Sequence, residues 1–357
     1  MGGCVNRAVV IERAARDVGD IAAALTIEHR DVPELRDGEV RLRTIYLSVD
    51  PATATWVRMA APYMPFGPGD VLKGTVAGVI EESRVERFRP GDLVRAFARF
   101  QEVSVVPALG DVPEALAGGT NAVRHVPHDS DTPLHMALSL YSHVGIAAIS
   151  GFREIGRTQP GETVLVSSAA GATGSIVAQV AKADGCRVIG IAGGAEKCAY
   201  LLDDLGLDGA IDHRSEDVSA AIGRLAPDGV DVFFDNVGGP QLDDALENMA
   251  RGGRIIICGA VSQYGKAPED QYRLRNHLQL LLRQSMMRGF FLSEFDDRLE
   301  HYMGELRRLH STGAVKIREP HVVQGMEAFP DALVMQLEGG NRSKLMAQIG
   351  PLPSVSA

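Results

Sequence analysis

Short apolar runs separated by glycine, proline and aspartate characterise roughly the first 140 residues. The stretch GEVRLRTIYLSVD (Gly38–Asp50) alternates apolar and polar positions, which is the period of a half-buried β-strand. The runs VLKGTVAGVIEE (Val71–Glu82) and GDLVRAFARF (Gly91–Phe100) are bounded by turn-forming residues. Glycine and proline recur between the runs, as is typical of a barrel with tight corners. This part of the chain therefore predicts a small β-barrel domain.

The pattern changes near Glu162, where strand-like runs begin to alternate with helical stretches. Helical periodicity occupies Ser175–Gly185, Ala195–Gly206 and Val218–Ala226. Such alternation predicts βαβ units and a parallel sheet covered on both faces. Six runs fit a complete doubly wound nucleotide-binding domain, the Rossmann fold. The expected strands are Glu162–Ser168, Cys186–Ala192, Gly209–His213, Val230–Val237, Gly253–Ala260 and Gly289–Phe295.

The end of the chain contains one more helical stretch, Asp296–Gly313, and then short mixed segments that we expect to rejoin the first domain. A chain of 357 residues is too long for one hydrophobic core and suits two domains. We therefore predict a substrate domain over 1–140, a dinucleotide-binding domain over 141–314, and a C-terminal segment, 315–357, that returns to the substrate domain.

Composition and charge narrow the range of partners. Hydrophobic residues make up 45% and charged residues 23% of the chain, as in ordinary globular proteins. A net charge of -10 argues against nucleic acid or an anionic membrane as the main partner. The four cysteines have no CxxC spacing and are interpreted as reduced thiols, and no apolar run is long enough to cross a bilayer. We expect a cytoplasmic protein that acts on a small molecule.

The stretch VLVSSAAGATGSIVAQVAK (Val164–Lys182) carries a phosphate-binding turn in which Ala169 replaces the usual first glycine. Glycines between a strand and a helix let the backbone approach a pyrophosphate, whose charge then faces the helix N-terminus. Gly171 and Gly174 supply the close approach and the helix packing. The flanking strand and helix make the motif specific, so a turn that binds nothing is the weaker alternative. The expected contacts are Ala170, Gly171, Ala172, Thr173 and Gly174.

The second predicted strand indicates which nicotinamide cofactor is bound. NAD enzymes place an acidic residue at this strand end to hold the ribose hydroxyls, but the chain reads Ile191-Ala192-Gly193-Gly194 there. Lys197 follows three residues later, and Arg214 lies beyond the next strand. A missing carboxylate and available cations favour the 2′-phosphate of NADP(H). The alternative is that both cations simply belong to solvated faces.

Seven short motifs occur along the chain in a characteristic order and spacing. The motifs are YLSVDP (Tyr46–Pro51), PGDLV (Pro90–Val94), AAGATGS (Ala169–Ser175), GIAGGAEKC (Gly190–Cys198), DNVGG (Asp235–Gly239), CGAVSQY (Cys258–Tyr264) and EGGNRSKLM (Glu338–Met346). Together they resemble the zinc-independent medium-chain dehydrogenase/reductases, in the branch of prostaglandin reductases, alkenal double-bond reductases and curcumin reductases. The resemblance implies a GroES-like partial barrel, a Rossmann domain with the active site between them, a homodimer, and reduction of the carbon–carbon double bond of an α,β-unsaturated ketone or aldehyde by NADPH.

The resemblance also implies roles for individual residues. Lys197 is expected at the 2′-phosphate, Asn341 at the nicotinamide ribose or amide, and Tyr264 near the reacting carbons. The remaining expected cofactor contacts are Gly193, His213, Arg214, Asn236, Cys258 and Gly259.

Zinc is not expected, since a catalytic zinc needs three Cys, His or carboxylate ligands and an open position. The zinc-dependent relatives carry a GHE-type motif where this chain reads LKGTVAGVI (Leu72–Ile80). Conjugate reduction suits a site without a Lewis acid: hydride goes to the β-carbon, charge moves to the oxygen, and a proton reaches the α-carbon. A hydroxyl such as that of Tyr264 is a suitable donor to that oxygen, although a loop tyrosine that only packs is the alternative.

Departures from the family pattern concentrate on the substrate side. Asp50-Pro51 is followed by Ala52–Ala54 instead of Tyr-Met-Arg, and Leu282 matches an aromatic position of some members. On the same alignment His143 replaces a methionine and Ala147 a threonine, both beside the nicotinamide. These changes favour a substrate unlike the common alkenals, such as a bulky intermediate of secondary metabolism.

Three of these side chains are candidate substrate-side residues. His143 is a candidate proton donor, because an imidazole titrates near neutral pH, while a hydrogen-bonded histidine at a domain junction is the alternative. Tyr63 and Tyr141 are candidates for shaping the substrate pocket. His213 takes the place of a tyrosine often found beside the adenosine phosphate.

Two other functions fit the same motifs. Quinone reduction with NADPH needs no specific proton donor. A protein that binds NADPH as a sensor, without turnover, would have no acceptor at all.

Overall fold

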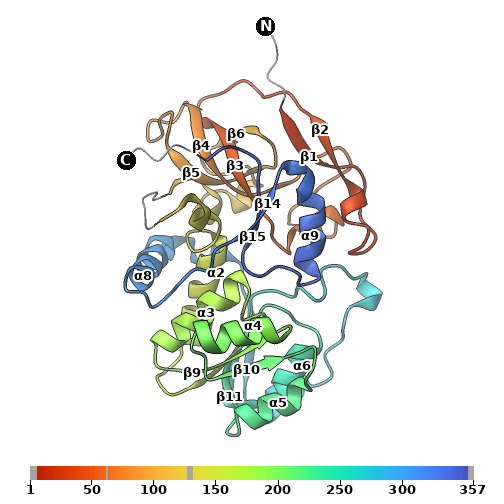
Figure 1. The fold of residues 1–357 in the computed structure, drawn as a ribbon, viewed down its shortest axis with the longest axis vertical. Coiled ribbons are helices and arrows are strands. Elements are labelled where there is room, and N and C mark those ends of the chain that lie inside the picture. Colours follow the sequence, from red (N-terminus) through yellow and green to blue (C-terminus); the bar gives the residue numbers. More distant parts are fainter. Residues whose placement is uncertain (1–5, 62, 127–131, 353–357) are drawn as a thin grey trace. The chain divides into compact units, whose positions relative to one another are not determined.

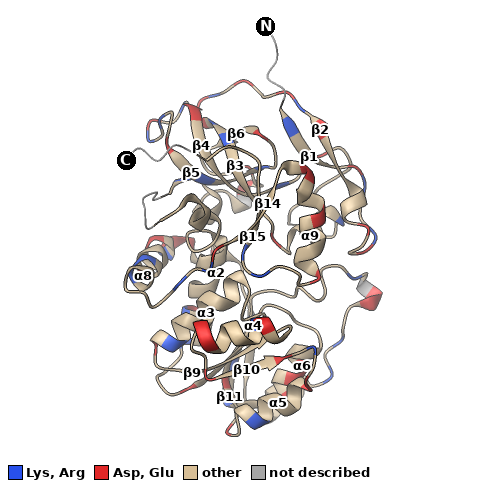
Figure 2. Ribbon diagram, viewed as in Figure 1, with Lys and Arg blue, Asp and Glu red and all other residues tan. Residues whose placement is uncertain are grey.

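The computed structural model describes residues 6–61, 63–126 and 132–352. The chain divides into two compact units, which we call unit 1 (1–142 and 319–357) and unit 2 (143–318). Figure 1 shows the elements of both units. Figure 2 shows acidic and basic residues interspersed along the elements of each unit, so the net negative charge is not concentrated on one element.

Unit 1 is built mainly on an antiparallel sheet whose central strand, β3, pairs with β4, β6 and β15. A two-stranded sheet, β1 with β2, lies outside it, and β14 pairs with β15 in parallel. The strands are β1 Arg7–Ile11, β2 Leu25–His29, β3 Glu39–Ser48, β4 Lys73–Ser83, β5 Leu93–Arg99, β6 Val103–Pro107, β7 Arg124–His125, β14 His321–Gln324 and β15 Leu345–Gln348.

Helices in unit 1 are short, apart from one in the C-terminal segment. The helices are α1 Thr53–Val57 and α9 Phe329–Leu337, with 3-10 turns at Ala22–Ala24, Glu114–Leu116, Gly119–Asn121, Leu134–Leu138 and Met326–Ala328. The C-terminal segment returns as β14, α9 and β15, and Met346 of β15 joins the buried cluster of Ile45 and Ala77. This segment is therefore part of the core of unit 1.

Unit 2 contains a six-stranded parallel sheet in the order β10-β9-β8-β11-β12-β13. This is the strand order of a doubly wound dinucleotide-binding domain, and the predicted fold class is confirmed. Val164, Phe233 and Ile255 are fully buried at its centre, as expected for strands covered on both faces. The strands are β8 Thr163–Val166, β9 Arg187–Ala192, β10 Gly209–Asp212, β11 Val230–Asp235, β12 Met249–Ile257 and β13 Met286–Gly289.

The helices of unit 2 cover this sheet. Helix α2 packs against α3 and α8, and α5 packs against α6. The helices are α2 His143–Gly151, α3 Ala172–Ala183, α4 Ala195–Ala199, α5 Val218–Leu225, α6 Pro240–Glu247, α7 Gln279–Leu282 and α8 Leu299–Ser311. π-helical turns at Phe152–Gly156 and Tyr200–Asp204 extend α2 and α4, and 3-10 turns lie at Pro268–Asp270 and Leu292–Arg298.

The prediction of the sixth strand over Gly289–Phe295 is wrong. The strand is β13, which ends at Gly289, and Leu292–Arg298 forms a 3-10 turn. The Glu294 carboxylate accepts the Phe291 backbone N–H at 3.0 Å and pairs with Arg288 at 2.8 Å, so the chain turns directly after the strand. The apolar run was misleading because its side chains do not continue the sheet: the Phe290 and Phe295 ring centroids lie 5.7 Å apart, and Phe291 is exposed.

Candidate active-site residues

The phosphate-binding turn follows β8 and accommodates alanine at its first position. Ser168 adopts a left-handed conformation (φ 49°), and the Ala169 N–H donates to the Ile191 carbonyl at 3.0 Å. The Ala169 side chain faces Gly190 on the neighbouring strand β9, where an added Cβ would lie 2.8 Å from it. The methyl group of Ala169 therefore occupies the space that a side chain at Gly190 would otherwise fill.

The two remaining glycines of the motif are required by close backbone contacts. A Cβ on Gly174 would lie 2.3 Å from the Ser168 carbonyl oxygen, and one on Gly171 would lie 3.0 Å from the same atom. Gly171 occupies the N-cap position of α3, so no side-chain hydrogen bond caps this helix. The N–H groups of Ala172, Thr173 and Gly174 thus open the helix at a compact turn, with Ala170 buried beside them. This donor set fits a pyrophosphate.

The end of β9 lies against the residues that follow β10. A Cβ on Gly193 would lie 2.8 Å from His213 Nε2 and 3.0 Å from Arg214 Nε, so both side chains cover this glycine. The Asp212 carboxylate accepts the backbone N–H groups of Gly194 at 2.7 Å and Arg214 at 3.0 Å. These bonds lower the pKa of Asp212 and hold the two loops together. The acid is therefore engaged with backbone amides.

Arg318 is a third basic residue near Lys197 and Arg214, and the sequence analysis did not identify it. Its guanidinium lies 4.6 Å from the centroid of the Tyr200 ring and 3.9 Å from the Glu196 carboxylate. The pKa of Lys197 is lowered by burial and by the positive charges of Arg214 and Arg318. Lys197, Arg214 and Arg318 thus share one electrostatic field. No local motif could have shown this, since Arg318 follows α8.

The turn after β11 is held by a buried carboxylate. Asp235 is fully buried and accepts the Ser167 hydroxyl at 2.7 Å, the Val237 N–H at 2.9 Å and the Gly238 N–H at 3.0 Å. Burial raises the pKa of Asp235, and these hydrogen bonds oppose that rise. Asn236 donates its side-chain amide to the Ser167 carbonyl at 2.8 Å. Asn236 is therefore fixed beside the phosphate-binding turn.

The loop after β12 brings Cys258, Gly259 and Tyr264 together. The Tyr264 hydroxyl accepts the Ala260 backbone N–H at 3.1 Å, and a Cβ on Gly259 would lie 3.2 Å from the same hydroxyl. Burial raises the pKa of the Cys258 thiol to about 12, so the group is neutral at physiological pH. The ring of Tyr264 therefore folds back over its own loop, with its oxygen at the strand end.

Asn341 lies in unit 1, where it is buried and donates to the Ser343 carbonyl at 2.8 Å. The Ser343 hydroxyl donates to the Glu319 carbonyl at 2.6 Å, which joins the two ends of the returning segment. The Lys344 ammonium donates to Asp50 at 2.6 Å and to the Val49 carbonyl at 3.1 Å. Lys344 is 6% exposed. The EGGNRSKLM and YLSVDP motifs are thus joined by a buried ion pair.

The candidate aromatic residues of the substrate side differ in exposure. Tyr63 is 42% exposed, and its hydroxyl accepts the Trp56 indole N–H at 3.4 Å. Tyr141 is buried and follows the turn Leu134–Leu138. The structure therefore places Tyr63 at the surface of unit 1 and Tyr141 in its interior.

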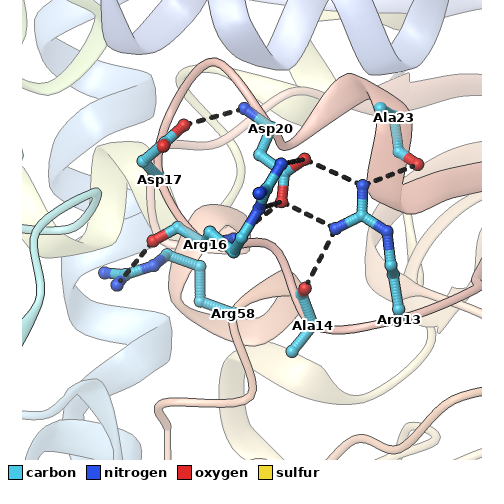
Figure 3. A network of polar contacts seen from close by, with 7 residues as sticks. All are labelled: Arg13, Ala14, Arg16, Asp17, Asp20, Ala23 and Arg58. Carbon is cyan, nitrogen blue, oxygen red and sulfur yellow. Dashed lines mark hydrogen bonds and ion pairs between the residues drawn. The ribbon is translucent and has the colours of Figure 1, made fainter.

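A charged network anchors the segment that carries Trp56. Asp20 accepts hydrogen bonds from Arg13 at 2.6 Å and from the backbone and side chain of Arg16 at 2.9 and 3.1 Å (Figure 3). Arg58, just after α1, donates to the Arg16 carbonyl at 3.2 Å. The loop that follows β1 is thereby tied to the end of α1.

His143 is the first residue of α2 and of unit 2, and it is partly exposed. Ser142, immediately before it, is buried and donates its hydroxyl to the Ser139 carbonyl at 2.9 Å. This bond closes the last turn of unit 1.

The side chains and the helix lengths of the described residues bear on metal binding and on membrane crossing, respectively. Within 6–61, 63–126 and 132–352, no three His, Cys, Asp or Glu side chains form a group that could hold a metal ion. In the same part of the chain, every helix is too short or too polar to cross a membrane.

The sheet order and the phosphate-binding turn define a nucleotide-dependent enzyme class, and comparisons with known proteins specify it. Residues 172–308 match the family model described as "Zinc-binding dehydrogenase", and residues 11–112 match "N-terminal domain of oxidoreductase". The chain is 36% identical to YfmJ of Bacillus subtilis over 325 residues, which are 89% of this chain and 90% of that protein. It is 34% identical to a 2-alkenal reductase (NADP(+)-dependent) of Nicotiana tabacum over 321 residues, 89% of each chain.

A solved structure, CurA from Vibrio vulnificus in complex with NADPH, is 32% identical, with a TM-score of 0.82 over 97% of this chain and 100% of that chain. The chain belongs to the zinc-independent medium-chain dehydrogenase/reductases, in the branch that the sequence motifs indicated. It is an oxidoreductase that uses NADP(H).

Proposed function

We propose that the protein reduces the carbon–carbon double bond of an α,β-unsaturated ketone or aldehyde with NADPH. In the balanced reaction, hydride adds to the β-carbon, the π electrons move onto the carbonyl oxygen as an enolate, and a proton from the medium reaches the α-carbon. The similarity to an alkenal reductase supports this reaction type. The departures at Ala52–Ala54 and Leu282 support a substrate bulkier than simple alkenals.

The cofactor supplies the hydride when it is bound, and the residues of unit 2 fit its charged groups. The amides that open α3 would hold the pyrophosphate, because they form a positively polarised helix end at a glycine turn. Lys197 and Arg214 would pair with the 2′-phosphate as cations. Asn236, Cys258 and Gly259 would line the side of the cofactor at the ends of β11 and β12. Asn341 would hold the nicotinamide ribose or amide.

The observation that carries the proposal is the hydrogen bond from the Ala260 N–H to the Tyr264 hydroxyl oxygen. A hydroxyl that accepts one hydrogen bond is polarised and becomes a better donor in the next. We infer that Tyr264 donates a hydrogen bond to the developing enolate oxygen. His143 is the second candidate donor, at the start of α2. Tyr63 and Tyr141 would shape the pocket, the first by contact and the second by packing.

The experiment is NADPH oxidation at 340 nm with a linear enal, an aryl enone, a cyclic enone and a quinone, with NADH in parallel. Identification of the product by mass and NMR distinguishes a saturated ketone from an allylic alcohol. Turnover to the saturated ketone supports the proposal, and a Tyr264→Phe variant is then expected to lose about 10²-fold or more in kcat. Formation of an allylic alcohol, turnover of the quinone alone, or NADPH binding with no turnover would each overturn it.

We also infer that a second copy of the chain covers the edge of the parallel sheet. β13 ends the strand order, and no strand of the described residues pairs with its other edge. The neighbouring helix α7 presents Leu281 and Leu282 with 72% and 63% of their side chains exposed. An open strand edge beside exposed leucines favours association with another chain. The family resemblance also implies a homodimer.

Light scattering after size-exclusion chromatography tests the dimer. Leu281→Glu is expected to give a monomer, because a carboxylate would be buried in the interface. Leu202→Glu is the matched control, since Leu202 is another exposed leucine of unit 2 outside this surface. A Leu281→Glu protein that remains a dimer contradicts the assignment of the surface.

A further inference from the structure

The imidazole of His213 lies beside Lys197 and Arg214, the two basic residues proposed above to bind the 2′-phosphate. Its backbone N–H donates to the Ala192 carbonyl at 3.1 Å, which fixes the residue at the end of β9. Its Nε2 atom lies over Gly193, at 2.8 Å from the place where a side chain would begin. Arg214 Nε lies at 3.0 Å from the same point. An imidazole nitrogen and a guanidinium therefore face one glycine at a strand end.

The charges around the ring are mostly positive. Arg214 follows it in the chain, Lys197 faces it from α4, and Arg318 adds to the field at Lys197. The negative groups are Asp212, which is engaged with the amides of Gly194 and Arg214, and Glu216 and Glu196 further out. An approaching phosphate would add negative charge to these mostly positive surroundings.

We propose that His213 is a specificity-determining residue for the 2′-phosphate and holds it as an imidazolium, so that NADPH binds together with a proton and NADH does not. The proposal rests on the cofactor contacts proposed above for Lys197 and Arg214. An imidazolium can donate a charge-assisted hydrogen bond to a phosphate oxygen, whereas a neutral tyrosine at this position would donate without charge.

Electrostatics determine the direction of the proton exchange. Partial burial and the positive charges of Arg214 and Lys197 lower the pKa of His213, while Asp212 opposes the change. The ring is therefore neutral at physiological pH before the cofactor binds. A phosphate carrying nearly two negative charges reverses the sign of the local field and raises that pKa. A group whose pKa rises on binding takes up a proton, and affinity then increases as pH falls.

Isothermal titration calorimetry in buffers of different ionisation enthalpy counts the protons taken up. At about pH 7.5 a phosphate monoester is almost entirely dianionic, so the ligand itself contributes little. We expect uptake of about 0.3 proton or more with NADPH, none with NADH, and none with NADPH in a His213→Gln variant, because glutamine does not titrate. The affinity for NADPH is expected to rise about threefold to fivefold from pH 8.5 to 6.5 in the native protein if the pKa rises by one unit.

Lys197→Gln is the matched variant, since it removes another basic side chain from the same site. It is expected to weaken NADPH binding while proton uptake persists, whereas His213→Gln abolishes the uptake. Equal proton counts in the native protein and the His213→Gln variant would overturn the proposal. Because these readouts need no turnover, the absence of enone reduction would refute the proposed reaction without affecting them.

Discussion

Replacement of Lys344 by methionine tests whether the ion pair with Asp50 holds the returning segment onto unit 1. The ammonium donates to Asp50 at 2.6 Å and to the Val49 carbonyl at 3.1 Å, and the side chains are 5% and 16% exposed. Removing one partner of a buried pair costs about 3–5 kcal/mol, because the other charge stays buried without compensation. Asp50 keeps some contact with water, so we expect a loss of about 2–4 kcal/mol in the free energy of unfolding of unit 1.

The single tryptophan provides an assay that reports on unit 1 alone. Trp56 lies in α1, is 8% exposed, and has the ring of Phe97 at 5.9 Å. A protein with two units does not satisfy a two-state model as a whole, so a local probe is needed. Urea unfolding followed by Trp56 fluorescence should show a lower midpoint for Lys344→Met with an unchanged slope.

A double-mutant cycle with Asp50→Asn isolates the coupling between the two side chains. We expect a coupling energy of about 2 kcal/mol, because the double variant no longer buries an uncompensated charge. Arg30→Met is the control, since the Arg30–Glu28 pair is 2.9 Å long but 36% and 40% exposed. Breaking that exposed pair should cost about 0–1 kcal/mol. A coupling energy below about 0.5 kcal/mol would refute the reasoning, because exposed pairs already reach that value.

Three further predictions concern single residues. Gly174→Ala is expected to weaken NADPH binding about tenfold or more, because the added Cβ would lie 2.3 Å from the Ser168 carbonyl oxygen. Unfolding of unit 1, followed by Trp56 fluorescence, should not change. A variant that still binds NADPH tightly would contradict the role of the turn. Arg318→Gln should weaken NADPH binding about threefold to tenfold and leave NADH binding unchanged, as measured by fluorescence titration. Equal losses of affinity for both cofactors would assign Arg318 a structural role only. Hydrogen bonds from Arg13 and Arg16 lower the pKa of Asp20 below its unfolded value, so this stabilisation is present at neutral pH. It begins to be lost as pH falls below about 4 and decreases further toward the lower pKa of the folded state. Asp20→Asn should therefore flatten the decline of unit 1 stability between about pH 5 and 3, and an unchanged decline would contradict this cause.

The parts of the site that depend on neighbours in sequence could be predicted from the sequence. The strand, turn and helix from Glu162 to Gly185 have strict periodicities and glycines at fixed offsets, so their structure follows from local sterics. The strand order of the sheet also follows, because right-handed βαβ crossovers leave few alternatives.

The sixth strand shows where local patterns mislead. Gly289–Phe295 is as apolar as a buried strand, but the pairing of β13 with β12 ends at Gly289, and Glu294 caps the turn that follows. An apolar run does not reveal whether its side chains pack on a sheet or on one another. The exposed residues of β13 also have no period that distinguishes an edge strand from a loop.

Contacts between distant residues could not be predicted, although they determine the charge of the site. The sequence placed Lys197 and Arg214 near the cofactor phosphate through their distance from β9, yet Arg318 joins them only because the segment after α8 passes over Tyr200. The Lys344–Asp50 pair likewise connects residues 294 positions apart. Neither contact leaves a periodic signal in the sequence.

The position of Ala169 shows how a local rule and a distant contact combine. A glycine is usual there because the turn brings two backbones together, and an alanine would normally indicate a site that has lost its ligand. In this protein the extra methyl group faces Gly190 on β9, and the left-handed conformation that the turn requires is taken by Ser168. The small residue is therefore required at Gly190 on the adjacent strand instead of at position 169. The close contacts of Gly171 and Gly174 with the Ser168 carbonyl are kept. A degenerate motif keeps its phosphate-binding geometry when a neighbouring strand supplies the missing space, so the motif must be judged together with the strand beside it.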